Sequence, residues 1–256
     1  MEWNPELNKI QANISRRKKA DKAIDAAVLT PGTMIVGEGA GSLAAQAIPT
    51  GLSKETVQPM SKAKKKMLNK AMQYHKMDQN IKVVTGRKAL KSVTGMVPNA
   101  QAKVNQGKLI ERLNKPKSKV KYLFDQKINL PQGGNIEAAM HELGHLKHHQ
   151  RPIRHVISSS TGTIGKPVGA ALAVAGMMHE DTAKYVPVVA PAIAYGSLVG
   201  TEAGANAFAI KEMTRQKGFR AGLKTIKKVA PYMATYLAAP LAVGGALYGL
   251  KKKIHG

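Results

Sequence analysis

The chain has 256 residues, which is enough for one or two domains with a sizeable hydrophobic core. It contains no cysteine, so disulfide bonds and thiolate metal sites are excluded and any metal must bind through histidine and carboxylate ligands. The formal net charge of +25 favours an anionic partner, which can be a lipid head group, a nucleic acid or an acidic protein. Aromatic residues make up only 4% of the chain, which argues against base stacking but not against phosphate binding.

The first part of the chain, residues 1–119, is predicted to be a basic and mainly helical region. Residues 1–27 are typical of a charged helix, with Arg-Arg-Lys-Lys at positions 16–19. This basic face is either solvated or in contact with an acidic membrane surface. Because the stretch has no apolar run, we expect no secretory signal in it.

A second stretch, residues 26–53, is rich in glycine and alanine. It is interrupted by Pro31, Glu38 and Pro49, so its uncharged runs are too short to cross a membrane. We predict a buried or interfacial segment here.

Residues 54–80 are basic again and carry four methionines at loosely helical spacing, a pattern more typical of a core than of a binding groove. Residues 81–84 predict a short strand, and the segment that follows to residue 114 is expected to be partly helical. The four methionines of residues 54–80 are Met60, Met67, Met72 and Met77.

Residues 120–130 alternate between apolar and polar side chains, which predicts a half-buried strand. Ile128 and Leu130 fall on the apolar side, and Lys127 and Asn129 fall on the polar side. We expect an edge strand, whose free edge can pair with an extended peptide substrate. An ordinary edge strand without a substrate is the alternative.

The most informative stretch is residues 133–145, which contains the pattern His141-Glu142-x-x-His145. Asn135 is a plausible N-cap after a Gly-Gly turn, so the pattern is predicted to lie on a helix. Residues four apart share one helical face, so the two histidines can reach one ion together. Two imidazoles suit Zn²⁺, and Glu142 is then placed to take a proton from a water at the site. An exposed helix that merely carries two histidines is the alternative.

Two apolar stretches follow, at residues 156–178 and 185–201. Both depend on alanine, glycine and valine more than on leucine, so their insertion into a membrane is marginal by hydropathy. Their small residues would let two helices pack closely as a membrane hairpin. A pair of buried helices in a soluble protein is the competing interpretation.

Glu202 comes directly after the second apolar stretch and is the candidate third metal ligand. The pattern His-Glu-Leu-Gly-His, followed later by Glu202-Ala-Gly-Ala-Asn206-Ala-Phe-Ala, resembles the gluzincin metallopeptidases. The second motif is most similar to the ImmA/IrrE family. The layout, with two apolar segments between the motifs, is more similar to the membrane-embedded HtpX and CAAX-protease peptidases. The resemblance covers about residues 120–217.

This resemblance implies that His141, His145 and Glu202 bind Zn²⁺ and that Glu142 is the catalytic base. Asn206 stands where the HtpX-type pattern has an aspartate that supports a ligand histidine, and an asparagine carbonyl can still accept that hydrogen bond. An endopeptidase also needs an oxyanion stabiliser, for which the sequence leaves three candidates open: His149, Tyr195 and Arg215.

The charges around the apolar hairpin predict its orientation in a membrane. The segments before and after it are basic, at residues 147–154 and 211–220, whereas residues 179–184 between its arms are not. The positive-inside rule then places the metal site on the cytoplasmic side. A third apolar stretch, residues 229–250, is long enough to span, either as a full crossing or as a re-entrant hairpin bent at Pro240.

Together these patterns predict a mainly α fold with a small β element. Its zincin-like core would consist of an edge strand, the helix with the two histidines and a helix bearing Glu202. The predicted regions are residues 1–119, a core over 120–228 with an apolar hairpin at 156–201, and a C-terminal apolar segment over 229–256.

The function that these features predict is a membrane-associated zinc endopeptidase, which acts on a peptide or protein and contacts lipids with anionic head groups. One alternative is a basic structural or membrane-penetrating protein, such as a virion component, with a vestigial or structural zinc site. Another is a protein that binds nucleic acid through its N-terminal half.

Overall fold

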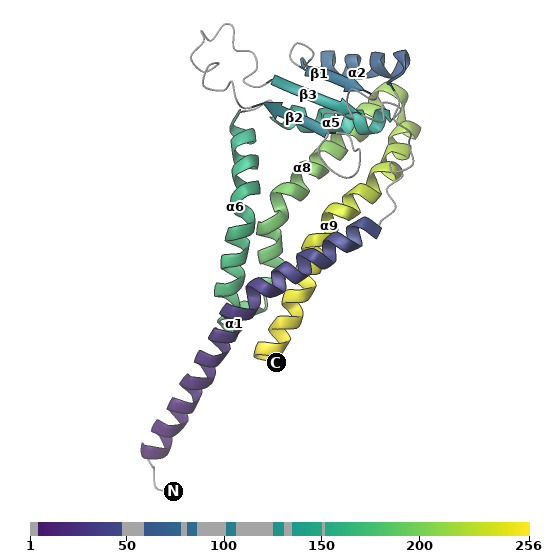
Figure 1. Cartoon of the computed structure of the whole chain (residues 1–256). Coiled ribbons are helices and arrows are strands. Elements are labelled where there is room, and N and C mark those ends of the chain that lie inside the picture. Colours follow the sequence, from purple (N-terminus) through teal and green to yellow (C-terminus); the bar gives the residue numbers. More distant parts are fainter. Residues whose placement is uncertain are drawn as a thin grey trace, which may run out of the picture. The chain divides into compact units, whose positions relative to one another are not determined.

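The computed structural model describes residues 5–47, 59–77, 81–85, 101–105, 125–130, 135–149 and 152–256. In these residues the chain is mainly helical with one small β-sheet, as the sequence predicts (Figure 1). It forms two compact units. The helical unit consists of Met1–Ala47, Thr161–Ser197 and Thr235–Gly256, and the sheet unit consists of Ile48–Ser160 and Leu198–Ala234. The units interleave along the chain, so each combines stretches that the sequence analysis places in different regions.

The sheet unit contains three described strands, β1 (Ile81–Thr85), β2 (Gln101–Asn105) and β3 (Asp125–Leu130), in the order β1-β3-β2. β3 pairs parallel with β1 and antiparallel with β2. The predicted edge position of β3 is therefore wrong, and β1 and β2 are the outer strands of the described sheet. Alternation along one strand does not reveal how many neighbours that strand has. Asn129, assigned to the polar side of the strand, is fully buried in its central position.

The strand predicted at residues 81–84 is confirmed as β1. β2 lies in a segment for which partial helix was predicted. Gln101–Asn105 is a strand, and the rest of that segment, residues 86–100 and 106–114, lies outside the described residues. Strand formation here depends on pairing with β3, which lies more than twenty residues later and leaves little trace in local sequence. The first residues of the predicted strand 120–130 lie outside the described residues.

Two helices of the sheet unit build its core. α2 (Lys62–Tyr74) begins at Ser61, whose side chain caps it, and α5 (Ile136–His149) begins after Asn135. The Asn135 Oδ1 accepts a hydrogen bond of 3.0 Å from the Ala138 backbone N–H, which confirms the predicted N-cap. α5 packs on β2 and β3 and also contacts α2. The methionines predicted to be core residues are confirmed: Met60, Met72 and Met77 are buried, and Met67 packs against the same cluster.

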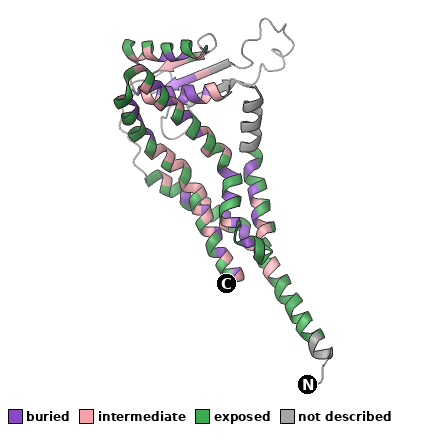
Figure 2. Cartoon of the chain, turned by 180° about the vertical axis from the view of Figure 1, so that it is seen from behind, coloured by how far each residue is buried: buried purple, intermediate pink, exposed green. Residues whose placement is uncertain are grey.

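The helical unit begins with α1 (Pro5–Ala47), a single helix of 43 residues that continues through Pro31. The sequence analysis divides this stretch into a charged helix and a separate buried or interfacial segment, and that division is wrong. Only a narrow stripe of α1 is buried, including Ala26 and Met34, and most of the helix is exposed (Figure 2). Such a stripe at helical spacing is enough to hold one helix against its neighbours.

Four further helices follow: α6 (Pro152–Met177), α7 (Glu180–Ala183), α8 (Val186–Lys217) and α9 (Phe219–His255). α6, α8 and α9 each contribute residues to both units. α9 is continuous through Pro240, so of the two forms left open for the C-terminal segment, the re-entrant hairpin is not adopted.

Small residues line the contacts between helices of the helical unit. A Cβ added at Gly169 of α6 would lie 2.8 Å from the Ala190 carbonyl oxygen of α8. A Cβ added at Gly37 of α1 would lie 2.8 Å from the Val243 Cα of α9. Both glycines have a partner four residues away, Gly165 and Gly41 respectively, in the spacing that brings membrane helices close together. The close packing predicted for the apolar hairpin is thus found.

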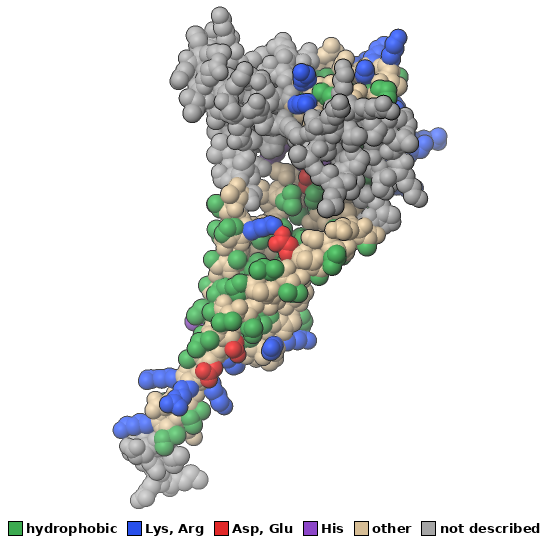
Figure 3. Space-filling view, viewed as in Figure 1, with side chains coloured by type: hydrophobic (Ala, Val, Ile, Leu, Met, Phe, Trp, Pro, Cys, Tyr) green, Lys and Arg blue, Asp and Glu red, His purple; other side chains and the backbone are tan. Residues whose placement is uncertain are grey.

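Large apolar side chains lie on the outside of the same unit. α8 and α9 are long and apolar enough to cross a membrane, and only 33% and 17% of their most apolar windows are buried. A core helix of a soluble protein would be mostly buried instead. Figure 3 shows hydrophobic side chains over much of the visible face of this unit, with Lys and Arg gathered on the N-terminal half of α1. The exposed apolar residues include Val28, Val36, Leu43, Ile164, Val168, Leu172, Val188, Val189, Leu237 and Leu241.

Candidate metal centre

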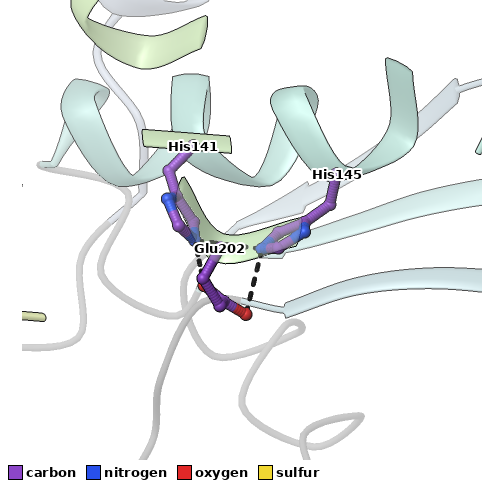
Figure 4. A group of neighbouring side chains, drawn as sticks. All are labelled: His141, His145 and Glu202. Atoms are coloured by element: carbon purple, nitrogen blue, oxygen red, sulfur yellow. Dashed lines mark hydrogen bonds and ion pairs between the residues drawn. The ribbon is translucent and has the colours of Figure 1, made fainter. Parts of the chain in front are cut away.

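Three side chains that are far apart in the sequence meet inside the sheet unit. His141 and His145 lie one turn apart on α5, and Glu202 comes from α8 (Figure 4). The two Nε2 atoms are 3.0 Å apart. Glu202 reaches both rings, with Oε2 at 3.2 Å from the His141 Nε2 and Oε1 at 3.4 Å from the His145 Nε2. The geometry therefore presents two imidazole nitrogens and one carboxylate to a common point.

A close crossing of α5 and α8 brings these ligands together. Gly144 lies on the face of α5 that carries the histidines, three residues after His141. A Cβ added at Gly144 would lie 2.8 Å from the Cα of Ala205 and 3.0 Å from its carbonyl oxygen. Since real Cβ atoms do not approach backbone so closely, only glycine allows the helices to approach this far.

Asn206 orients one of the ligands. Its side-chain Oδ1 lies 2.7 Å from the His141 Nδ1, at the position where the sequence analysis places a partner for a ligand histidine. An amide oxygen accepts a hydrogen bond, so this contact puts the proton of a neutral His141 on Nδ1. The Nε2 lone pair is then directed at the point shared with His145 and Glu202.

The electrostatics of the site favour positive charge. Burial by itself lowers the pKa of His141, but the hydrogen bond to Glu202 and the negative charge of Glu142 outweigh it, so the pKa is raised above its ordinary value. Glu142 is buried beside these ligands on α5. Two carboxylates around two imidazoles thus form a site that stabilises a bound cation.

The group of His141, His145 and Glu202 could hold a metal ion, because its ligand atoms all lie within 4.8 Å of one another. All three side chains are largely buried. Together they offer nitrogen and oxygen ligand atoms, a combination that suits a divalent transition metal.

Comparisons with protein-family models, with curated proteins and with solved structures found no match to this chain. The resemblance to gluzincin peptidases therefore rests on the sequence alone, on the motifs at residues 141–145 and 202–209 and on the layout between them.

The three candidates for an oxyanion stabiliser have different positions. Arg215 lies 13 residues after Glu202 on α8, roughly 20 Å along the helix axis, and is paired with Glu212. This position argues against a role at the metal site. Tyr195 belongs to the helical unit, where it packs against Lys166. The side chain of His149 lies outside the described residues.

A second buried polar cluster joins α2, α5 and α8. The His75 Nε2 is 2.8 Å from the Glu212 Oε1, although 137 residues separate them, and the Lys147 Nζ contacts the His75 Nδ1. His75 is buried, with only 8% of its side chain exposed. Burial, assisted by Lys147, lowers the pKa of His75, so a neutral ring links the helices. No local sequence signal marks a partner so distant along the chain.

Proposed function

We propose that this chain is a membrane-associated zinc-dependent endopeptidase. The observation that carries the proposal is the convergence of His141, His145 and Glu202, with Glu142 beside them on α5. In a tetrahedral zinc site, donor atoms lie roughly 3.3–3.4 Å apart. The two Nε2 atoms are 3.0 Å apart, and each lies 3.2 or 3.4 Å from a different carboxylate oxygen of Glu202, which is close to this spacing.

The ligand set favours zinc among the divalent metals. Two imidazoles and one carboxylate form a typical catalytic zinc set, and three protein ligands leave a fourth position open. When bound there, Zn²⁺ would lower the pKa of a coordinated water and polarise a substrate carbonyl. The hydrogen bond from the His141 Nδ1 to Asn206 supports this arrangement, because it frees Nε2 for the metal.

Glu142 would act as the general base. Its carboxylate is buried and lies next to His141 in the sequence of α5, where it can accept a proton from the attacking water. The same carboxyl group would then donate that proton to the nitrogen of the leaving amine as the peptide bond breaks. Glu202 is held by both histidines and is assigned to metal binding.

An extended peptide substrate would pair with β2. This strand is an outer strand of the described sheet and packs against α5, which carries the two histidines. β2 therefore takes the role that the sequence analysis gives to β3. Backbone hydrogen bonds to such a strand align a peptide regardless of its side chains.

The membrane association is supported by the helical unit. Its large apolar side chains face outward, while its helix contacts are made by glycine and alanine, which is the arrangement expected in lipid. The predicted cytoplasmic orientation rests on a smaller charge difference than the sequence suggested. The His255 Nε2–H donates to the Met177 carbonyl oxygen, so the lysines at residues 251–253 lie at the same end of the unit as α7. Lys18, Lys19 and Lys22 of α1 lie at that end too.

The metal content of the purified full-length protein, compared between the wild type and Glu142→Gln, tests this function. We expect one zinc per chain in both proteins, because Glu142 is not a metal ligand. Cleavage of a mixed peptide library, followed by mass spectrometry, should fall by a factor of about 10² to 10⁴ in the variant. Treatment with a chelator should abolish cleavage by the wild type, and added Zn²⁺ should restore it.

His145→Ala is the matched control, since it removes a ligand and should lose the zinc together with the activity. A wild-type protein that purifies without zinc, and does not take it up, would end the proposal.

A basic membrane protein with a structural zinc site is the second candidate, because the exposed apolar surface of the helical unit does not require catalysis. It predicts zinc in both the wild type and Glu142→Gln, no cleavage by either, and a fall in thermal stability when the zinc is removed. The same two proteins therefore distinguish the candidates.

A further inference from the structure

A charged cavity lies at the α7 end of the helical unit. Its volume is about 900 Å³, and it is bounded by the N-terminal half of α1, the turn between α6 and α7, and His255 of α9. Five charged side chains line it: Lys18, Lys19 and Lys22 from α1, and Glu180 and Asp181 from α7. Three lysines against two carboxylates leave a net charge of +1 when the histidines are neutral.

These charged groups do not neutralise one another directly. Among the described residues, no ion pair within 4.0 Å joins the lysines of this cavity to Glu180 or Asp181. The cavity therefore offers the ammonium groups of its three lysines, and a net positive charge, to an anion.

An apolar groove adjoins the cavity. It lies between α6 and the start of α8, has a volume of about 360 Å³, and is lined by Leu172, Ala175, Val186 and Val189, among others. His179 lines both the groove and the cavity, so the two spaces are neighbours on either side of this residue. A charged space next to an apolar one matches a molecule with a polar head and a hydrocarbon tail.

We propose that the cavity and the groove together bind one anionic glycerophospholipid. Its phosphate lies among the lysines of α1, and one acyl chain lies in the groove between α6 and α8. The single negative charge of such a lipid balances the net charge of the cavity. This binding site is separate from the metal centre and stands whether or not the chain is a peptidase.

The apolar groove makes a lipid the ligand rather than a free phosphate or a nucleic acid. Either of those would use the lysines alone and would leave the groove uncovered. The groove opens among exposed apolar side chains of α6 and α8, where acyl chains would lie in a membrane. Lysines at the end of an apolar helix bundle are also well placed for the head-group layer of an acidic membrane.

Native mass spectrometry of the full-length protein in nonionic detergent tests the proposal. The probes are phosphatidylglycerol and phosphatidylcholine with the same acyl chains. We expect the wild type to retain one phosphatidylglycerol in preference to phosphatidylcholine. Lys18→Gln/Lys22→Gln should weaken this retention about 25-fold, because each lysine near an anionic lipid strengthens binding about fivefold.

The matched control is Arg16→Gln/Arg17→Gln, which removes the same charge from the same helix at positions that do not line the cavity. It should retain phosphatidylglycerol nearly as the wild type does. Equal losses in the two double variants would show general charge attraction and would overturn the site. Equal retention of phosphatidylcholine by the wild type would overturn it as well.

A second pair of variants examines the groove without changing any charge. Ala175→Trp fills the groove and should weaken phosphatidylglycerol retention several-fold, whereas Ala171→Trp, one turn earlier and outside the lining, should not. Displacement of the lipid by inorganic phosphate alone, with no effect of Ala175→Trp, would show a phosphate site instead and would overturn the proposal.

Discussion

At the scale of single residues, Asn206 makes the site unusual. It accepts a hydrogen bond from the His141 Nδ1 but carries no charge, so it raises the basicity of the ring less than an aspartate would. Its buried Nδ2 has no hydrogen-bond partner among the described residues. A buried amide N–H group without a partner costs free energy. The hydrogen bond that the side-chain carbonyl oxygen of Asn206 accepts from His141 is therefore the contact that explains an asparagine here.

Replacing Asn206 tests this role. Asn206→Ala should weaken zinc binding by a factor of about 10 to 100, since the orientation of a ligand histidine is lost. Asn206→Asp introduces a carboxylate at this position and should bind zinc at least as tightly as the wild type. Competition with a chromophoric chelator measures both affinities. An unchanged affinity in Asn206→Ala would show that the hydrogen bond does not support the metal.

At the scale of elements, the crossing of α5 and α8 decides whether a site exists. The two helices carry the three candidate ligands, and they approach each other closely at Gly144 and Ala205. On α8, Ala205 and Ala209 are buried along the face that also presents Glu202 and Asn206. A larger residue in this interface would push Glu202 away from the histidines.

Gly144→Ala should therefore impair the site although the residue binds nothing. The added Cβ would approach the backbone of Ala205 to 2.8 Å, and relieving such overpacking costs about 1–3 kcal/mol. We expect a lower melting temperature and weaker zinc binding. Thermal unfolding by circular dichroism and the chelator competition measure the two effects.

Gly204→Ala is the matched control, because a Cβ at this position of α8 meets nothing within 4 Å. It should stabilise the helix by about 0.5–1 kcal/mol and leave zinc binding unchanged. If both alanine variants bound zinc like the wild type, the close crossing would not be what positions Glu202.

At the scale of the whole molecule, two of the helices that build the sheet unit continue into apolar stretches of the helical unit. α8 carries Glu202 directly after its uncharged residues 186–201, and α9 follows α8 after Gly218. If α8 crosses a bilayer, its two ends lie in different compartments, and the charge pattern predicts that the metal site faces the cytoplasm.

The absence of cysteine from the chain makes this orientation directly measurable. Lys184→Cys places one thiol before α8, and Lys217→Cys places one at its end. A membrane-impermeant maleimide should label position 184 in intact cells and position 217 only after permeabilisation. The reverse pattern would place the metal site outside, and labelling of neither before permeabilisation would contradict a crossing by α8.

Features that depend on near neighbours in the chain were predictable from the sequence. The N-cap at Asn135, the helical spacing of His141 and His145, and the apolar stretches that became α8 and α9 follow from local hydrogen bonding and periodicity. The choice of Glu202 as a ligand came from a motif resemblance, and its contact with both histidines required the fold.

Other features were decided by the tertiary structure alone. The central place of β3, the continuity of α1 through Pro31 and the link between His75 and Glu212 have no signature in local sequence. Each depends on pairing or packing between segments that are distant along the chain. A periodic pattern reports which face of a segment is buried, but only the folded chain determines what buries it.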